Sequence, residues 1–131
     1  TPAPTPAPTP DPTPAPTPVP TPDPTPAPTP TPTAPPDAVP GPFSINGFDA
    51  ATTKDTAFAI WYTPTTLTTS QVRWGVDFAM SNYTVVDTAM VNNHSVTITG
   101  LKSQTLYYFQ AISKDASGNE VRSQVISKLT K

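Results

Sequence analysis

Proline occupies every second position of residues 1–32, which are eight tetrapeptides of the form Thr-Pro-Xaa-Pro. Each residue of this repeat is either a proline, whose φ is fixed at about −65°, or a residue that precedes a proline and is excluded from the helical region. Half of the amides carry no N–H and no side chain is large enough to build a core, so sheet and globule are excluded as well. The repeat therefore predicts a polyproline II rod with a reach of about 100 Å, at about 3.1 Å per residue.

Threonine mostly recurs every four residues of the repeat, whereas polyproline II has about three residues per turn, so successive hydroxyls point in all directions around the axis. Such a rod lacks the constant face of a conventional proline-motif ligand. Thr-rich, Pro-rich segments are typical of O-glycosylated stalks, and a bare spacer that resists proteolysis is the alternative. The candidate O-glycosylation sites are Thr1, Thr5, Thr9, Thr13, Thr17, Thr21, Thr25, Thr29, Thr31 and Thr33.

Composition divides the chain at residue 42. Of the 21 prolines, 20 lie before residue 43, and all 11 aromatic residues lie after residue 42. We therefore expect a Thr/Pro-rich polyproline II stalk or linker over 1–42 and one small domain over 43–131. The strict alternation ends at 33–42, which lets the chain turn before the domain begins.

Charge and cysteine content exclude several classes of function. The first 42 residues carry only Asp11, Asp23 and Asp37, and the remainder has six acids against seven Lys and Arg, so neither part offers a basic surface for nucleic acid. The absence of cysteine excludes disulfides, thiolate zinc sites and a thiol nucleophile. No apolar run of about 18 residues occurs, so we expect no membrane span. The chain begins inside the repeat without Met, and we expect a processed product or fragment of a secreted or cell-surface protein.

Short alternating apolar runs separated by turn residues follow the boundary, and no helical period is sustained. Turn signals about every ten residues are typical of an all-β sandwich or barrel. The pattern predicts seven strands in an antiparallel sandwich. Their expected ranges are 43–48, 56–62, 70–75, 82–87, 94–100, 105–113 and 120–128.

The run Leu101-Lys102-Ser103-Gln104-Thr105-Leu106-Tyr107-Tyr108-Phe109-Gln110-Ala111 resembles the corner between strands E and F of fibronectin type III domains. In that family a Leu fills the core before the corner and a Tyr bonds back across it, and the matching positions are Leu101 and Tyr107. Ser103 stands where the family often has Pro. Three further runs resemble the family's strand B with its core Trp, its strand C and its F to G turn: Ala57-Phe58-Ala59-Ile60-Trp61, Val72-Arg73-Trp74-Gly75 and Lys114-Asp115-Ala116-Ser117-Gly118-Asn119. The resemblance covers nearly all of 43–131 and implies an immunoglobulin-like sandwich.

Alternation along the expected strands assigns an apolar core. If Trp61 faces inward, Phe58, Ile60 and Tyr62 must face outward together, and an exposed apolar stripe of this kind is a candidate interface. The alternative is that the N-terminal strand or linker covers these three side chains. The expected core residues are Ala57, Ala59, Trp61, Val72, Trp74, Val96, Ile98, Leu101, Tyr107, Phe109, Ala111, Val121 and Val125.

Residues that could carry chemistry are scattered along the domain. His94 is the only histidine, has no ligand partner at metal-binding spacing, and is expected at the surface. The carboxylates lie at turns and strand ends, and neither a nucleophile elbow nor a phosphate-binding glycine loop is present, so we expect no cofactor and no catalysis. Asn82-Tyr83-Thr84 and Asn93-His94-Ser95 fit the N-glycosylation acceptor pattern, which makes Asn82 and Asn93 candidate N-glycosylation sites.

These features favour a non-catalytic extracellular structural or adhesive protein, in which a glycosylated rod carries the sandwich. The subunit of a surface filament or sheath is one form of this hypothesis. Two alternatives stay open: the linker and accessory module of a secreted polysaccharide-degrading enzyme, and a glycan- or protein-binding module. The expected partners are further copies of the chain, other surface proteins or glycans, with no nucleic acid.

Overall fold

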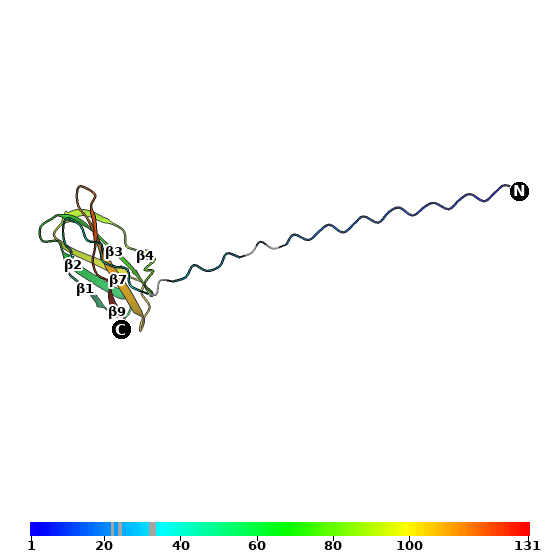
Figure 1. Cartoon of the computed structure of the whole chain (residues 1–131). Coiled ribbons are helices and arrows are strands. Elements are labelled where there is room, and N and C mark those ends of the chain that lie inside the picture. The colour runs from blue at the N-terminus through cyan, green and yellow to red at the C-terminus, as the bar shows by residue number, and fades with distance from the viewer. Residues whose placement is uncertain (22, 24, 32–33) are drawn as a thin grey trace.

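The computed structural model describes residues 1–21, 23, 25–31 and 34–131, and these residues form nine β-strands and no helix (Figure 1). The expected all-β, antiparallel architecture is confirmed. The strands are β1 (Asn46–Thr52), β2 (Thr56–Tyr62), β3 (Thr68–Gly75), β4 (Asn82–Tyr83), β5 (Asp87–Val91), β6 (Asn93–Thr99), β7 (Leu106–Lys114), β8 (Glu120–Arg122) and β9 (Ile126–Leu129).

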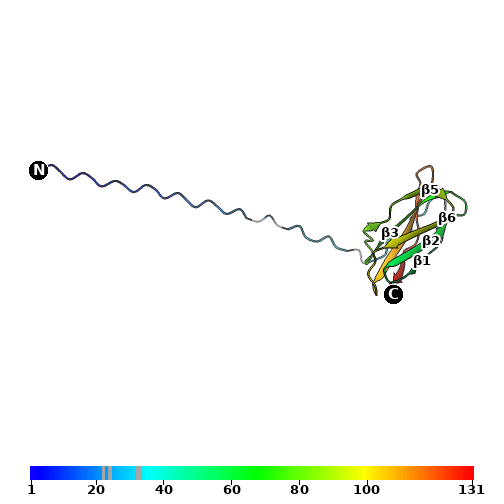
Figure 2. The same cartoon turned by 180° about the vertical axis from the view of Figure 1, so that it is seen from behind.

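The strands form two sheets, and every pairing within them is antiparallel. The first sheet has the order β1-β2-β6, so β2 is its central strand (Figure 2). The second has the order β4-β3-β7-β8, with β5 also paired to β3 and β9 also paired to β7. The buried apolar residues of both sheets belong to one cluster, so the two sheets pack as a sandwich around a shared core.

The structure has nine strands where the sequence predicts seven, because the last expected strand is interrupted and because the fourth ends early at Tyr83 and is followed by β5, most of which lies beyond the expected range of 82–87. At the end of β4 and at the end of β8, a hydroxyl side chain accepts a hydrogen bond from the neighbouring strand. The Thr84 hydroxyl accepts from the Val72 N–H at 3.0 Å, and the Ser123 hydroxyl accepts from the Ala111 N–H at 2.9 Å. Because the side chain takes the place of a main-chain carbonyl, the regular ladder ends there.

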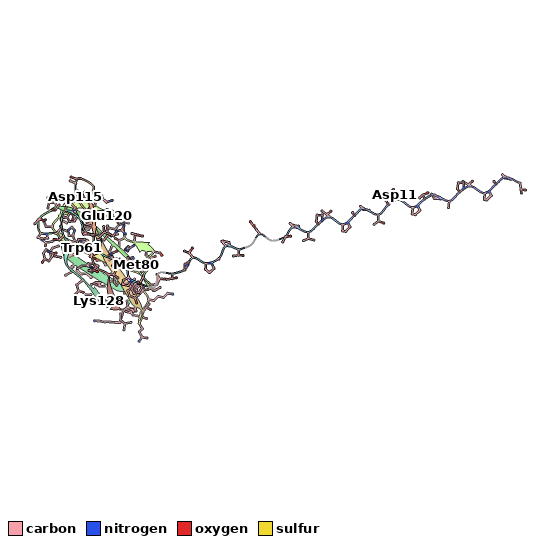
Figure 3. The ribbon with its side chains drawn as sticks, in the orientation of Figure 1. Asp11, Trp61, Met80, Asp115, Glu120 and Lys128 are labelled. Carbon is pink, nitrogen blue, oxygen red and sulfur yellow. The ribbon has the colours of Figure 1, made fainter. Side chains whose placement is uncertain are left out.

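Three anchors of the expected core lie inside the sandwich. Trp61 (Figure 3), Leu101 and Tyr107 are buried, and Trp74 is half-buried with its ring 5.7 Å from that of Tyr107. The buried apolar cluster consists of Ala50, Ala57, Ala59, Trp61, Val72, Ile98, Leu101, Tyr107, Phe109 and Ala111.

The remaining expected core positions differ in detail. Val121 is buried, and Val96 is half-buried against the cluster. Val125 is half-buried as well, but it is the next residue, Ile126, that packs against the cluster, because the interruption before β9 shifts the alternation. Phe43 and Met80 are buried although the alternation did not include them.

The turn before β7 is closed by the Tyr107 side chain. The Lys102 N–H donates to the Tyr107 hydroxyl at 3.0 Å, and Gln104 occupies the left-handed region with φ 49°. A buried tyrosine needs a partner for its hydroxyl, and this main-chain donor supplies one. The bond is the one that the resemblance implies at this position.

The described residues of the Thr-Pro repeat are exposed and form an extended trace that leads away from the sandwich (Figures 1 and 3). They contain neither helix nor strand. All candidate O-glycosylation threonines except Thr33 are among them, and Thr33 lies outside the described residues. Across the part of the chain that the structure describes, no helix is long and apolar enough to cross a membrane.

Residues 37–43, here called the strap, dock on the sandwich before β1 begins. Val39 and Arg122 exchange two main-chain hydrogen bonds, of 3.2 and 3.0 Å, which adds an antiparallel bridge to the free edge of β8. The Gln110 side-chain amide donates to the Asp37 carbonyl at 3.3 Å, and the Phe43 side chain is buried. Contacts with the sandwich therefore begin at Asp37, earlier than the expected boundary at residue 43, and β1 starts later than the expected first strand over 43–48.

Candidate functional site

The outer face of the first sheet carries three large apolar side chains in a row on its central strand. Phe58, Ile60 and Tyr62 are 48%, 47% and 45% exposed, whereas Ala57, Ala59 and Trp61, which alternate with them, are buried. The period of two along β2 produces this arrangement, because successive side chains point to opposite faces of a sheet. We call Phe58, Ile60 and Tyr62 the stripe.

The residues that flank the stripe are small or polar. In the strand register, Ala51 and Thr97 lie beside Phe58, Asp49 and Ser95 beside Ile60, and Asn46 and Asn93 beside Tyr62. The stripe is therefore an apolar ridge between two rows that a partner could meet with hydrogen bonds.

Asp49 is the one charged residue among these six neighbours of the stripe, and it is paired. Its Oδ1 lies 2.7 Å from the Lys128 Nζ. The hydrogen bond from Lys128, followed by one from the Ala50 N–H, lowers the pKa of the Asp49 carboxyl below its ordinary value. Because these opposite charges lie in contact, they compensate each other, and the six flanking positions carry no uncompensated charge.

A glycine shapes one end of this face. Gly47 has φ +62°, and a β-carbon added there would lie 2.9 Å from Cε1 of the Tyr62 ring. Only glycine combines that backbone conformation with so close an approach. The chain bends here, since β1 shifts register between Asn46 and Asp49. The result is a hollow of about 280 Å³ lined by Gly47, Ile60, Trp61, Tyr62, Asn93 and His94.

The linker does not cover the stripe among the residues that the structure describes. The strap docks on β8, which belongs to the second sheet, while the stripe lies on the outer face of the first. The alternative in which the N-terminal segment shields these side chains therefore has no support from the described part of the linker.

The two candidate N-glycosylation residues differ in their surroundings. Asn82 lies in β4 and its side-chain amide donates to the Trp74 carbonyl at 3.2 Å. Asn93 is exposed at the start of β6, directly opposite Tyr62. A sugar on Asn93 would therefore lie beside the stripe.

His94 is buried, which corrects the expectation that it lies at the surface. Its side chain is 3% exposed and stacks on the Trp61 indole with a centroid distance of 4.9 Å and an interplanar angle of 7°. Its ring nitrogens lie within hydrogen-bond distance of the hydroxyls of Ser70, Thr63 and Thr68. Burial lowers the pKa of His94, and the nearby Asp87 carboxylate opposes this shift.

The signal for this burial was present in the sequence. Val96 and Ile98 are expected to face inward on their strand, and His94 has the same parity, so alternation also points it toward the core. The Trp61 indole N–H is satisfied in the same region, where it donates to the Ser113 hydroxyl at 3.0 Å.

The carboxylates of the domain serve turns and ion pairs. Asp77 accepts from the Ala79 N–H, and Asp115 accepts from the Ser117 and Asn119 N–H groups, each at 2.9 Å. Within the described ranges, no three His, Cys, Asp or Glu side chains come close enough together to hold a metal ion. The described residues therefore offer an apolar contact face and a buried polar cluster.

Comparison with protein-family models, with curated proteins and with solved structures found no match to this chain.

Proposed function

We propose that this chain is a non-catalytic extracellular structural or adhesive protein, in which a glycosylated polyproline II rod carries a fibronectin type III-like sandwich that makes contact through the stripe. The observation that carries the proposal is the exposure of Phe58, Ile60 and Tyr62 side by side on the central strand of an open sheet. Apolar area removed from water contributes about 25 cal/mol per Å², so one contact that covers all three side chains gains in proportion to their combined area.

The partner that we favour is a second copy of the chain, as in a filament or sheath. The face is close to neutral because the Asp49 carboxylate is paired with Lys128, so two copies can approach each other without like-charge repulsion. A two-fold arrangement would bring the two ridges together and bury both of them.

The test compares the full chain with the variant Phe58→Thr/Ile60→Thr/Tyr62→Thr, in which threonine keeps β-propensity while the apolar surface is removed. The matched control replaces three apolar residues elsewhere that are at least as exposed, Leu67, Val85 and Leu129, with threonine. Sedimentation equilibrium should show concentration-dependent association of the native chain and of the control, and its loss in the stripe variant. A native chain that stays monomeric at every concentration, or a control that loses association equally, contradicts self-association through this face.

The glycosylated rod is tested separately by the intact mass of material from the source organism. The described threonines of the repeat are exposed, so each hydroxyl is accessible to a transferase. O-glycosylation predicts a large mass excess that maps to peptides from 1–42. A mass equal to that of the bare sequence would leave the repeat as an unmodified spacer.

Glycan binding is a second candidate, favoured by the aromatic rings of Phe58 and Tyr62 beside a row of hydroxyl and amide side chains on β6. Aromatic faces and hydrogen-bonding groups together are what a neutral sugar requires. A glycan array should then show binding that Tyr62→Ala abolishes and that Tyr83→Ala, at a similarly exposed tyrosine, retains. An array without binding would remove this candidate and leave self-association untouched.

A further inference from the structure

We propose that His94 is a pH-sensitive link between the two sheets: its neutral imidazole connects them, and its protonation destabilises the folded sandwich. The inference is independent of what the stripe binds. It rests on the group formed by His94, Thr63, Thr68 and Ser70, here called the His94 cluster.

The His94 cluster joins residues of both sheets. The Nδ1 of His94 on β6 lies 2.8 Å from the Ser70 hydroxyl oxygen on β3. Its Nε2 lies 3.1 Å from the hydroxyl oxygen of Thr63, which directly follows β2, and 3.2 Å from that of Thr68 on β3. β6 belongs to the first sheet and β3 to the second, so one side chain connects the two layers through polar contacts.

The neutral ring suits this cluster in either tautomer. A neutral imidazole has one donor nitrogen and one acceptor nitrogen, and a hydroxyl can donate or accept. Thr63, Thr68 and Ser70 are themselves fully or almost fully buried, so water does not compete for these bonds. Every polar atom of the cluster is satisfied without an ion, which a buried site requires.

A protonated ring would be a buried cation without a carboxylate in contact. The groups that pack around the ring within the described residues are uncharged. They are Trp61 on β2, Thr63 directly after β2, and Thr68 and Ser70 on β3. Ser113 on β7 joins them through its hydrogen bond to the Trp61 indole. A cation above the indole face gains some attraction, and the Asp87 carboxylate on β5 adds more. Burial outweighs them, since the net direction of the His94 pKa is downward.

The pH dependence follows from that direction. Above the ordinary histidine pKa of 6.5 the ring is neutral in both the folded and the unfolded chain, and stability does not depend on it. As the pH falls below 6.5, the unfolded chain binds a proton and the folded chain does not, so the folding equilibrium constant falls by up to tenfold per pH unit. The loss ends once the pH passes below the lowered folded-state pKa.

The experiment uses the full chain, whose single histidine makes the assignment unambiguous. Proton NMR of the folded chain should show one imidazole Cε1–H resonance that titrates with a midpoint below 6.5. In parallel, urea unfolding followed by tryptophan fluorescence from pH 8 to pH 5 should show a falling midpoint. His94→Gln, which retains an amide able to donate and accept but does not titrate, should show a midpoint that is flat between pH 7 and pH 5.

Each of these measurements can contradict the proposed role of His94. A ring that titrates at or above 6.5 overturns the proposal, as does a native chain whose midpoint is as flat as that of His94→Gln. If His94→Gln does not fold, Asp87→Asn supplies the second test. Asp87 lies opposite Ser70 in the β3–β5 register, and its removal should lower the NMR midpoint of His94 further. An unchanged midpoint in that variant, together with a midpoint of 6.5 or above in the native chain, would show that the ring is exposed to solvent.

Discussion

Removing the Tyr107 hydroxyl tests the corner before β7, because a phenylalanine keeps the ring and loses only the bond. The ring packs 5.7 Å from Trp74 and 6.3 Å from Phe109, and these contacts survive in Tyr107→Phe. What is lost is the 3.0 Å hydrogen bond from the Lys102 N–H to a hydroxyl on a side chain that is 4% exposed.

The size of the effect follows from the surroundings of this bond. A net hydrogen bond contributes about 0.5–1.5 kcal/mol, and a donor left buried without a partner costs about 1–3 kcal/mol. Because Lys102 itself is exposed, water can reach its amide in part, so we expect a loss of about 1–2 kcal/mol. For a domain of this size that corresponds to a fall in Tm of about 4–16 °C, at about 4–8 °C per kcal/mol.

Urea unfolding of the full chain measures this loss, with an unchanged m-value as the sign that the unfolded state is unaffected. Tyr62→Phe is the matched control, since it removes a hydroxyl from a tyrosine on the exposed stripe. A Tyr107→Phe variant whose free energy of unfolding lies within about 0.5 kcal/mol of the native value, the range typical of surface substitutions, would contradict the expected loss.

Three further changes probe other parts of the domain. Gly41→Ala should displace the strap, because the new β-carbon would lie 2.5 Å from the Val121 Cγ2, and hydrogen exchange of the β8 amides should become faster; unchanged exchange would mean that the strap does not protect this edge. Trp61→Phe should lower the free energy of unfolding by about 2–4 kcal/mol, since it leaves a cavity and removes the hydrogen bond to the buried Ser113 hydroxyl. A decrease of less than about 1 kcal/mol, measured by urea unfolding, would contradict the burial of this side chain. Asp49→Asn should cost less than about 1 kcal/mol, and the effect should shrink further in high salt, because the ion pair with its lysine partner is exposed; a larger loss that persists in salt would argue for a more buried pair.

Much of the sandwich could be predicted from the period of two in its strands. The same period places Trp61 inward and its neighbours on β2 outward. Where a strand is interrupted, the alternation between inward and outward side chains shifts by one residue, so Ile126 packs against the core cluster in place of Val125. The strand interruptions at Thr84 and Ser123 could not be predicted in this way. They depend on which main-chain N–H each hydroxyl meets across the sheet, and that is decided by the pairing of distant strands.

In the candidate site too, local features could be predicted from the sequence, whereas features that depend on distant strands could not. The stripe follows from local alternation alone, so its outward direction was predictable. The His94 cluster unites residues from separate strands, and isolated Ser and Thr residues carry no sign in the sequence that they will converge on one ring. The strap was missed for a related reason, because Val39 is a single apolar residue in a proline-rich segment and its bond to β8 requires the folded edge.

The strap also has a mechanical consequence. A load applied through the repeat reaches the sandwich first at the hydrogen bond from the Gln110 side-chain amide to the Asp37 carbonyl, next at the two hydrogen bonds between Val39 and Arg122, and only then at the buried Phe43 side chain. Releasing residues 37–43 would free a segment with a contour length of about 23 Å, at about 3.3 Å per residue, before β1 bears tension. The strap would thus detach from the sandwich under force, before the sandwich itself unfolds, and would dock again when the force is removed.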